Sequence, residues 1–207
     1  MQYHYQIHSE SNAYKGFFRI RRYEVSYESF RGGMCETVVR ECMGGGYVVS
    51  ALPYDPQRQE IVLVEQFRIG ATIAGERPWQ YEIVAGFVDV DDVSPEESMQ
   101  RELEEEIGTR AQHLEHLFTY LGSPGGSAGR THLYLAEIDS SQIATYSGLE
   151  EEGEDIAVHR LSYEETLCWL FAGKLNNSNT LLALQAFLLR HPQLQKQWAD
   201  NHEKAAP

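Results

Sequence analysis

A short acidic segment with clear boundaries, residues 94–108, constrains the fold of this chain more than any other feature. Residues suited to the two ends of a helix flank it: Ser94, Pro95 and Glu97 at the start and Gly108 at the finish. Between them, Met99, Leu103 and Ile107 recur every four residues, which places three apolar side chains on one face. The sequence therefore predicts a helix over residues 94–107 that packs one side against a core.

The same segment carries Glu102, Glu105 and Glu106, whose spacing puts them together on a second face. Like charges at this spacing repel by roughly 0.2–0.5 kcal/mol per pair, so a purely structural helix gains nothing from them. Acidic runs on helices are usually solvated faces, and the run by itself leaves that interpretation open. The alternative is a site for a hard divalent cation, in which Arg101 pairs with Glu105 one turn away.

Composition and charge limit the class of protein. The chain has 207 residues, of which 42% are hydrophobic and 23% are charged, so we expect one packed domain with an elaboration. A net charge of -14 argues against a nucleic-acid partner, because such binding rests on a broad basic surface. An acidic protein can still bind a small phosphorylated molecule if a metal ion supplies positive charge.

The cysteines and the hydropathy pattern indicate a compartment. Cys35, Cys42 and Cys168 are odd in number and lack the spacing of a metal site, so we expect reduced thiols. The first residues show no basic and apolar leader pattern, and no apolar run approaches the ~20 residues of a membrane span. We therefore expect a cytoplasmic protein without a membrane partner.

The glycine run at residues 44–46 separates two regions of different pattern. Before it, residues 17–31 alternate apolar and charged side chains, which predicts one or two exposed antiparallel strands continued by residues 34–41. We therefore divide the chain into an N-terminal β segment, residues 1–46, and a main domain, residues 47–207.

The main domain mixes strand and helix patterns. Strands are predicted at residues 47–54, 61–67, 81–85, 116–121, 131–138 and 155–161. The first two flank a polar turn at residues 55–59, which predicts a hairpin. Two further helices are predicted at residues 163–172 and 178–190, the first with a capping box formed by Ser162 and Glu165. This order indicates α/β layers around a mixed or antiparallel sheet.

Residues 101–108, Arg-Glu-Leu-Glu-Glu-Glu-Ile-Gly, resemble the core of the Nudix box, G-x5-E-x7-R-E-U-x-E-E-x-G-U, in which U is a bulky apolar residue. Thr109 departs from the pattern at its last position. Fourteen residues separate Gly86 from Arg101 where the pattern has thirteen, and Asp92 stands where the pattern has its first glutamate. The resemblance implies a Nudix-like α/β/α sandwich with an N-terminal antiparallel β segment, in which the loop before the helix carries a one-residue insertion.

Further motifs resemble the ADP-ribose pyrophosphatase branch of that family, at residues 64–68, 79–86, 123–126, 148–156 and 173–177. This resemblance implies that Mg²⁺, with Mn²⁺ as the alternative ion, is bound by the carbonyl of Ala85 and by Glu102, Glu106 and Glu154. It also implies catalytic carboxylates at Glu152, the general base, and at Glu105. From the sequence alone, the acidic loop 150–155 either lies in solvent or closes over a metal-rich site.

The same resemblance implies substrate contacts at six positions: Phe17, Arg40, Arg68, Trp79, Ser123 and Gly125. The two arginine forks suit phosphate or ribose oxygens. Most of these positions also have a plainer interpretation. Arg68 could lie at a strand end on the surface, Phe17 and Trp79 could belong to a core or a dimer interface, and residues 123–126 could form only a tight turn. Members of the branch carry a basic residue near Gly45 and an acidic residue near Gly129, so this chain makes fewer substrate contacts or prefers another sugar.

These features together predict a Mg²⁺-dependent hydrolase that cuts the pyrophosphate bond of ADP-ribose to give AMP and ribose 5-phosphate. The alternatives are a hydrolase of another nucleoside-diphosphate sugar, a Nudix-fold module that senses a nucleotide sugar without cutting it, and a structural acidic protein. The resemblance also implies a homodimer paired through the N-terminal strands. The exposed-strand pattern alone fits a monomer with protected edges equally well.

Overall fold

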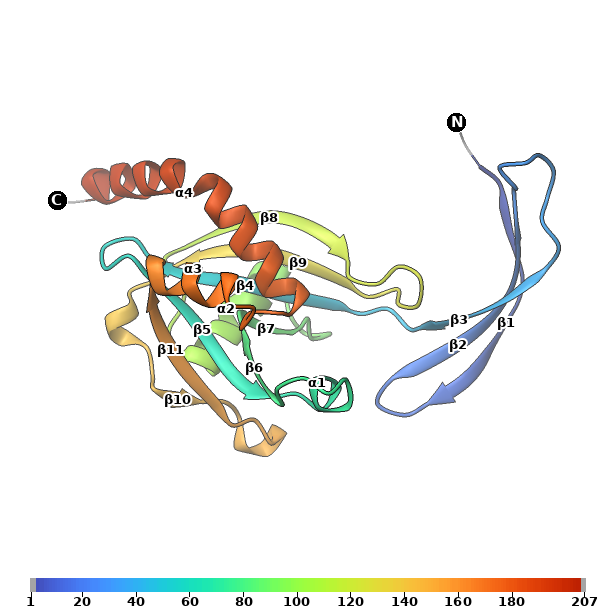
Figure 1. Ribbon diagram of the computed structural model, residues 1–207, viewed down its shortest axis with the longest axis horizontal. Coiled ribbons are helices and arrows are strands. Elements are labelled where there is room, and N and C mark those ends of the chain that lie inside the picture. The colour runs from blue at the N-terminus through green and yellow to red at the C-terminus, as the bar shows by residue number, and fades with distance from the viewer. Residues whose placement is uncertain (1–2, 206–207) are drawn as a thin grey trace. The chain divides into compact units, whose positions relative to one another are not determined.

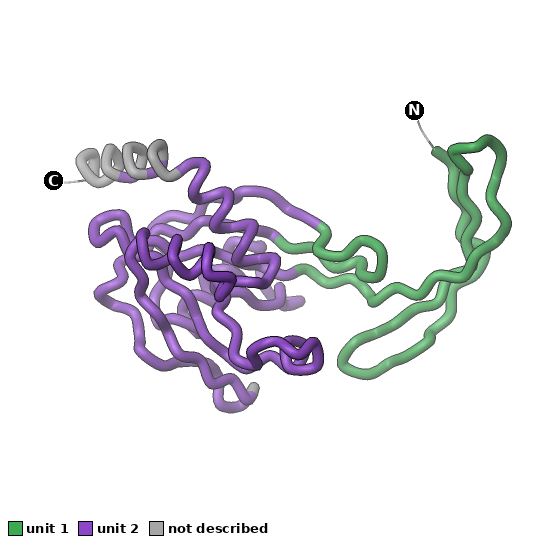
Figure 2. Tube along the Cα trace, viewed as in Figure 1, with its two compact units in different colours: residues 1–47, 121–131 green, residues 48–120, 132–207 purple. Residues whose placement is uncertain are grey.

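The computed structural model describes residues 3–205, apart from the side chains of residues 152, 191–193, 195–197 and 199–205. The chain divides into two compact units, shown in different colours in Figure 2. The first unit comprises residues 1–47 and 121–131, and the second comprises residues 48–120 and 132–207. Within residues 3–205, every helix is too short or too polar to cross a lipid bilayer.

The first unit holds a three-stranded antiparallel sheet in the order β1-β2-β3 (Figure 1). Its strands are β1 (Tyr5–Lys15), β2 (Arg19–Tyr27) and β3 (Val38–Met43). The predicted antiparallel N-terminal segment is confirmed, but β1 was not predicted from the sequence. Every residue of β1 is exposed, so this strand lacks the alternation of buried and exposed positions by which strands are detected.

The loop at residues 123–126 belongs to the first unit and forms the predicted turn. The N–H of Gly126 donates to the carbonyl of Ser123 at 3.0 Å. The loop is fastened to the end of β3, because the N–H of Met43 donates to the carbonyl of Gly126 at 2.8 Å. The turn is therefore a fixed part of the first unit.

Most of an eight-stranded sheet lies in the second unit, counted among the described residues. Its order is β10-β11-β5-β4-β9-β8, with β6 paired to β5 and β7 paired to β4. The strands are β4 (Tyr47–Asp55), β5 (Glu60–Phe67), β6 (Trp79–Glu82), β7 (Val84–Phe87), β8 (His113–Leu121), β9 (Arg130–Glu137), β10 (Tyr146–Ser147) and β11 (Ile156–Ser162). The single strand predicted at residues 81–85 is in fact two strands, because the chain moves from one partner, β5, to another, β4, at Ile83.

Helices cover both faces of this sheet. The helices are α1 (Ile69–Ile73), α2 (Pro95–Ile107), α3 (Tyr163–Phe171) and α4 (Ser178–Ala205), with short 3₁₀ turns at Ser140–Gln142 and Glu150–Glu152. On β4, Val49 and Ala51 pack in one apolar cluster with Met99 of α2. Leu52 and Tyr54 of the same strand pack in a second cluster with α4. Successive strand residues point to opposite faces, so α2 and α4 lie on opposite sides and the expected α/β/α layering is confirmed.

Helix α4 is longer than the predicted helix at residues 178–190. Its continuation to Ala205 buries Leu194 and Trp198, which are 1% and 0% exposed, in the same cluster as Tyr54. The capping box predicted for α3 is confirmed, since Ser162 and Glu165 exchange both bonds.

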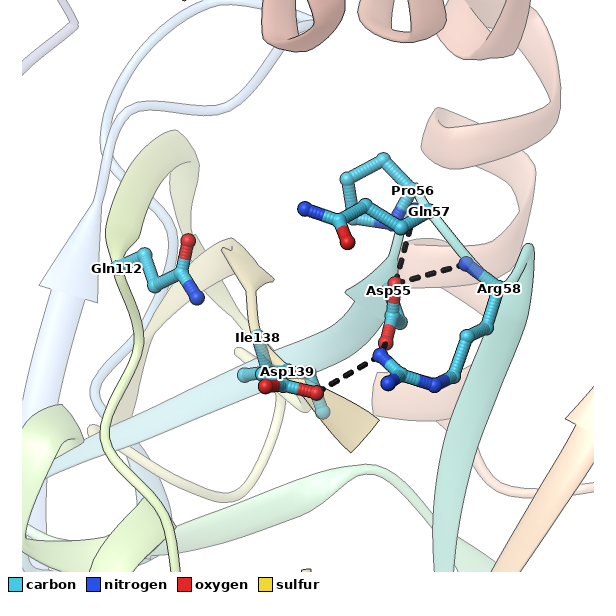
Figure 3. A pocket seen from close by; sticks show the side chains of 7 residues that line it. All are labelled: Asp55, Pro56, Gln57, Arg58, Gln112, Ile138 and Asp139. Carbon is cyan, nitrogen blue, oxygen red and sulfur yellow. Dashed lines mark hydrogen bonds and ion pairs between the residues drawn. The ribbon is translucent and has the colours of Figure 1, made fainter. Parts of the chain in front are cut away.

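The predicted β4–β5 hairpin is also confirmed, and a buried carboxylate fixes its turn. Asp55 is 1% exposed and accepts backbone N–H bonds from Gln57 at 2.8 Å and Arg58 at 2.9 Å. Figure 3 shows Arg58 reaching from the turn to both Asp55 and Asp139, at 3.0 and 2.8 Å. The pocket between them has a volume of about 30 Å³, which suits a single water rather than a ligand. This acidic cluster is therefore part of the scaffold.

Candidate metal centre

Helix α2 carries Glu102 and Glu106 one turn apart, and both side chains are buried. Only 8% of Glu102 and 2% of Glu106 remain exposed. The predicted apolar stripe lies on the neighbouring face of the helix and is fully buried in the core: Met99, Leu103 and Ile107. Because that stripe is locked into the core, the helix cannot turn its glutamates toward solvent. A solvated acidic face is therefore excluded for these two residues.

The ends of α2 agree with the sequence, with one difference. The Oγ of Ser94 accepts the N–H of Glu97 at 3.2 Å, and Gly108 ends the helix with φ 76°. In a full capping box the carboxylate of Glu97 would return to the backbone of Ser94. It pairs instead with Nη2 of Arg110, at 3.2 Å.

Strand β7 lies directly against the two buried carboxylates. A β-carbon built at Gly86 would overlap the carboxyl group of Glu102, so a glycine is required at this position. One residue earlier, the N–H of Ala85 donates to Oε2 of Glu106 at 3.3 Å. The residues at the start of the box and those on its helix are therefore brought together as the sequence predicted.

Arg101 binds three of the groups around this centre. Its Nη1 lies 2.8 Å from Glu102 Oε1 and 2.9 Å from Glu105 Oε2, so the predicted pairing with Glu105 is confirmed. Its Nη2 donates to the carbonyl of Phe87 at 3.0 Å. Burial opposes the charge of Arg101, but the hydrogen bond to Asp92, followed by the charges of Glu102 and Glu105, raises its pKa. Arg101 is thus a fixed cation that orients both glutamates.

Asp92, at the departure from the box pattern, ties the entry loop to the helix. Its Oδ2 accepts the hydroxyl of Ser98 at 2.7 Å and the N–H of Asp89 at 2.9 Å. The same oxygen lies 3.3 Å from Nη2 of Arg101. The hydrogen bond from Ser98, followed by that from the Asp89 backbone, lowers the pKa of Asp92. The inserted loop therefore closes on the helix, and Asp92 serves to hold Arg101.

The acidic loop that contains Glu154 is anchored on the last turn of α2. The hydroxyl of Ser147 donates to the carbonyl of Glu106, and the N–H of Gly148 donates to the carbonyl of Glu105 at 3.3 Å. Gly148 has φ 103°, and a β-carbon there would lie 2.8 Å from the carbonyl oxygen of Glu154. Only glycine fits this turn without strain. The loop and the helix glutamates therefore share one rigid support.

The electrostatics of the centre point to missing positive charge. Burial, with added repulsion from Glu105 and Glu154, raises the pKa of Glu102 to about 7 although Arg101 opposes the shift. Burial and the neighbouring Glu102 raise the pKa of Glu106 well above its usual range. Arg68 contributes a smaller opposing effect at Glu106. The carboxylates of Glu102, Glu106 and Glu154 thus repel one another, with too little cationic charge beside them.

The residues fit a hard divalent cation. Carboxylate and main-chain carbonyl oxygens are the ligands that Mg²⁺ prefers, and the ion would relieve the repulsion between Glu102, Glu106 and Glu154. Among the described side chains, no group of three or more His, Cys, Asp or Glu residues is placed so that it could hold a metal ion by itself. Mg²⁺ does not require such a group, because it usually takes one or two carboxylates and completes its shell with water and substrate phosphates.

A cleft of about 340 Å³ opens beside this centre within the second unit. The residues around it come from β4, the position after β5, β7 and the loop that follows it, α2, the acidic loop and the start of α4: Val48, Arg68, Ala85, Gly86, Phe87, Asp89, Arg101, Glu102, Glu154 and Asn179. Arg68 is held in the cleft by Glu82, whose Oε2 lies 2.8 Å from both Nε and Nη2 of the guanidinium. The cleft thus combines acidic groups suited to a metal with a fixed cation suited to phosphate.

The structure brings together some of the predicted site residues and not others. Ala85, Glu102, Glu154 and Arg68 line the cleft, and Glu106 lies directly behind Ala85. Trp79 lies on β6, packs edge-on against Phe67 at 5.7 Å, and lines a separate hollow. The side chain of Glu152 lies outside the described residues.

Four predicted substrate residues, Phe17, Arg40, Ser123 and Gly125, belong to the first unit. Phe17 is 84% exposed beside Phe18, and Nη1 of Arg40 donates to the carbonyl of Val39 at 2.9 Å. The roles of these four residues stay predictions. The two glycine departures lie together in this unit, since a β-carbon at Gly45 would lie 3.1 Å from the carbonyl of Ala128, next to Gly129.

Sequence reasoning missed Ser147 and Asn179. Ser147 immediately precedes the acidic motif at residues 148–156. A single serine at a strand end gives no sequence signal that would mark it as functional. Asn179 lies two residues beyond the branch-like motif at 173–177. Both were hidden because their importance comes from contacts with distant parts of the chain.

Comparison with known proteins identifies the family of this chain. A model of the NUDIX domain matches residues 46–178. The chain is 38% identical over 196 residues to an ADP-ribose pyrophosphatase of Haemophilus influenzae, covering 93% of this chain and 90% of that protein. It is 36% identical over 194 residues to the ADP-ribose pyrophosphatase of Escherichia coli K12, covering 94% and 92%.

Two further matches have lower sequence identity. A GDP-mannose pyrophosphatase of Pectobacterium atrosepticum is 32% identical over 175 residues, covering 84% of this chain and 89% of that protein. A crystal structure of an ADP compounds hydrolase superposes with a TM-score of 0.70 at 20% identity, covering 93% of this chain and 95% of that one. At that identity the likeness concerns the fold.

Proposed function

This chain is a member of the NUDIX family, and we propose that it hydrolyses the pyrophosphate bond of ADP-ribose, with water as co-substrate, to AMP and ribose 5-phosphate. The observation that carries the proposal is the crowded pair Glu102 and Glu106, buried beside a cleft that also contains Arg68. A divalent cation supplies the positive charge that this arrangement lacks, and it can bind the pyrophosphate of a substrate at the same time.

The choice of ADP-ribose rests on the relatives. The ADP-ribose pyrophosphatases match at 36–38% identity over more than nine-tenths of the chain, and the GDP-mannose pyrophosphatase matches at 32% over 84%. GDP-mannose and other nucleoside-diphosphate sugars are therefore the alternative substrates. A sensor without catalysis is disfavoured, since it has no need of two buried carboxylates whose burial is unfavourable without a cation.

We assign Mg²⁺ as the metal, held by Glu102, Glu106, Glu154 and the carbonyl of Ala85, with Mn²⁺ as a substitute. When bound, the ion supplies Lewis acidity and neutralises charge on the phosphates. Residues of the chain orient the carboxylates and bind the phosphate. Arg101 fixes the orientation of Glu102 and Glu105, and Arg68 offers a guanidinium to a phosphate oxygen.

Glu152 is our candidate for the general base. It would accept a proton from the attacking water, while Glu105, held by Arg101, keeps a negative charge close to the reacting phosphate. The anchoring of the acidic loop by Ser147 and Gly148 would place the base reproducibly over the cleft. Residues 123–126, Phe17, Arg40 and Trp79 stay candidates for further substrate contacts.

We further propose a cytoplasmic homodimer, with residues 1–46 as the pairing segment and residues 47–207 as the hydrolase domain. Large apolar side chains of the first unit are exposed on its strands and turns: Tyr5, Ile7, Tyr14, Phe17, Phe18 and Phe30. Exposed apolar groups in such number favour burial against a partner. Sedimentation at several protein concentrations would test the dimer.

The test of function is the release of AMP from ADP-ribose, measured with Mg²⁺, with Mn²⁺ and with EDTA. We expect turnover that requires the metal, and a higher kcat/KM for ADP-ribose than for GDP-mannose. A higher value for GDP-mannose would move the substrate assignment to the alternative. Binding of ADP-ribose without any release of AMP would support a sensor instead.

A further inference from the structure

The cleft is lined from both faces of the sheet, and only one of them carries the acidic centre. In the register of β4 and β7, Val48 lies opposite Phe87 and Ser50 lies opposite Ala85. Residues two apart on a strand share a face, so Val48 and Ser50 lie on the face of β4 away from Val49 and α2. The cleft therefore continues past β7 to the side covered by α4.

Asn179 of α4 occupies that second side, and both atoms of its amide are held. Its Oδ1 accepts the hydroxyl of Tyr120, and its Nδ2 donates to the hydroxyl of Ser50 at 3.1 Å. The amide nitrogen carries two hydrogens, of which the bond to Ser50 uses one. The amide of Asn179 is thus held in place beside Ala85 at the wall of the cleft, and one of its two N–H groups is not used by the bond to Ser50.

The start of α4 is itself anchored to the sheet. Asn177 Nδ2 donates to the carbonyl of Tyr81 at 2.8 Å, and the N–H of Ile83 donates to Oγ1 of Thr180 at 3.1 Å. Thr180 is fully buried. Asn179 is therefore presented by a rigid support, which is what selective recognition requires.

Resting on the proposed function, we propose that Asn179 is a specificity-determining residue that donates its remaining amide N–H to a sugar hydroxyl of the bound nucleoside-diphosphate sugar. The amide of Asn179 is neutral, which suits a neutral hydroxyl group. The charged phosphates are expected on the other side of the cleft, where Arg68 and the metal-binding carboxylates lie. Val48 and Phe87 provide an apolar surface next to the amide, which suits the C–H face of a sugar ring.

The substrate has two sugars, and the experiment tells them apart. kcat/KM is measured for wild type and Asn179→Ala on ADP-ribose, on ADP methyl ester, which lacks the terminal sugar, and on the 2′,3′-dideoxyadenosine analogue of ADP-ribose. One hydrogen bond lost is worth about a tenfold decrease on ADP-ribose. The decrease should vanish on the analogue that lacks the contacted hydroxyl, and that analogue identifies the sugar.

A merely structural role predicts something different. Asn179→Ala also removes the hydrogen bonds that Asn179 makes with Ser50 and Tyr120, and damage of that kind would lower kcat/KM equally on all three substrates. An equal decrease, or none, overturns the inference. Asn179→Asp serves as a second variant, because it keeps the acceptor for Tyr120, lacks the N–H donor, and repels all three substrates alike.

Asn176→Ala is the matched control, since Asn176 lies in the same segment but pairs with Glu76 at 3.4 Å and lines a different hollow. It should leave the ratios between substrates unchanged. Failure of the proposed function is distinguishable, because wild type would then release no AMP from ADP-ribose. Wild-type turnover combined with an equal decrease in the variant would overturn only the role of Asn179.

Discussion

Removing the charge of Glu102 should stabilise the metal-free protein at alkaline pH and have no such effect in acid. Folding raises the pKa of Glu102 from 4.5 to about 7, chiefly because burial penalises the carboxylate. A carboxyl group with a raised pKa binds its proton more tightly in the folded state. Its favourable contribution is therefore complete below pH 4.5 and is lost as the pH rises through 7.

The magnitude follows from the size of the shift. A change from 4.5 to about 7 corresponds to about 3 kcal/mol of folding free energy, at about 1.4 kcal/mol per pKa unit. Protonated glutamate and glutamine have nearly the same shape and are both neutral. We therefore expect Glu102→Gln to match wild type near pH 4, and to exceed its free energy of unfolding by up to about 3 kcal/mol at pH 8.

Urea unfolding in EDTA, followed by tryptophan fluorescence from pH 4 to pH 8, measures this difference. Burial, and then His116, lowers the pKa of His132, which adds the same contribution, rising with pH, to the stability of both proteins. Subtracting one curve from the other removes that contribution. Mg²⁺ should reduce the difference at pH 8, because the cation favours the carboxylate. Parallel curves for the two proteins would refute the reasoning.

Three further predictions concern the supports of the site. Gly86→Ala should leave a folded protein with kcat for AMP release reduced at least about 100-fold and stability lowered by about 1–3 kcal/mol, because the new methyl group overlaps the carboxyl group of Glu102; kinetics close to wild type would contradict the required glycine. Ser147→Ala should lower kcat with a loss of only about 1 kcal/mol in stability, since the hydroxyl anchors the acidic loop on α2. Ser147→Thr keeps the hydroxyl and should restore turnover. Unchanged kcat in the alanine variant would show that this anchor is dispensable. Asp55→Ala should lower the free energy of unfolding by about 3 kcal/mol without altering kcat of the folded enzyme. Burial alone would raise the pKa of Asp55, but N–H bonds from Arg58 and Ser140 hold it below the usual value, so part of its stabilising effect should be lost as the pH falls through that lowered pKa; denaturation midpoints insensitive to the substitution would contradict the scaffold role.

Much of the fold could be predicted because local signals and tertiary packing agree. Helix α2 has a cap, an apolar stripe and a glycine end in its own sequence, and the structure uses all three. Strand β1 and the second half of α4 carry weaker local signals. The first is exposed along its whole length, and the second is recruited by the burial of Leu194 and Trp198 in a distant cluster.

The site divides in the same way. Glu102 and Glu106 are recognisable because their spacing follows the helical repeat, whereas Ser147 and Asn179 matter only through partners far away in the chain. Asp92 is an intermediate case. The sequence shows that Asp92 stands where the box pattern has a glutamate. Only its contacts with Ser98 and Arg101 show that it ties the inserted loop to the helix.

The binding of Mn²⁺ to Glu106→Gln, measured by electron paramagnetic resonance together with AMP release, tests the central claim most directly. Glu104→Gln is the matched control, since the Glu104 side chain is 62% exposed on the same helix and pairs with Arg110. We predict that wild type and Glu104→Gln bind the ion alike, and that Glu106→Gln stays folded but binds it at least about tenfold more weakly, with turnover abolished. Equal Mn²⁺ affinity and normal turnover in Glu106→Gln would contradict a metal centre built on α2.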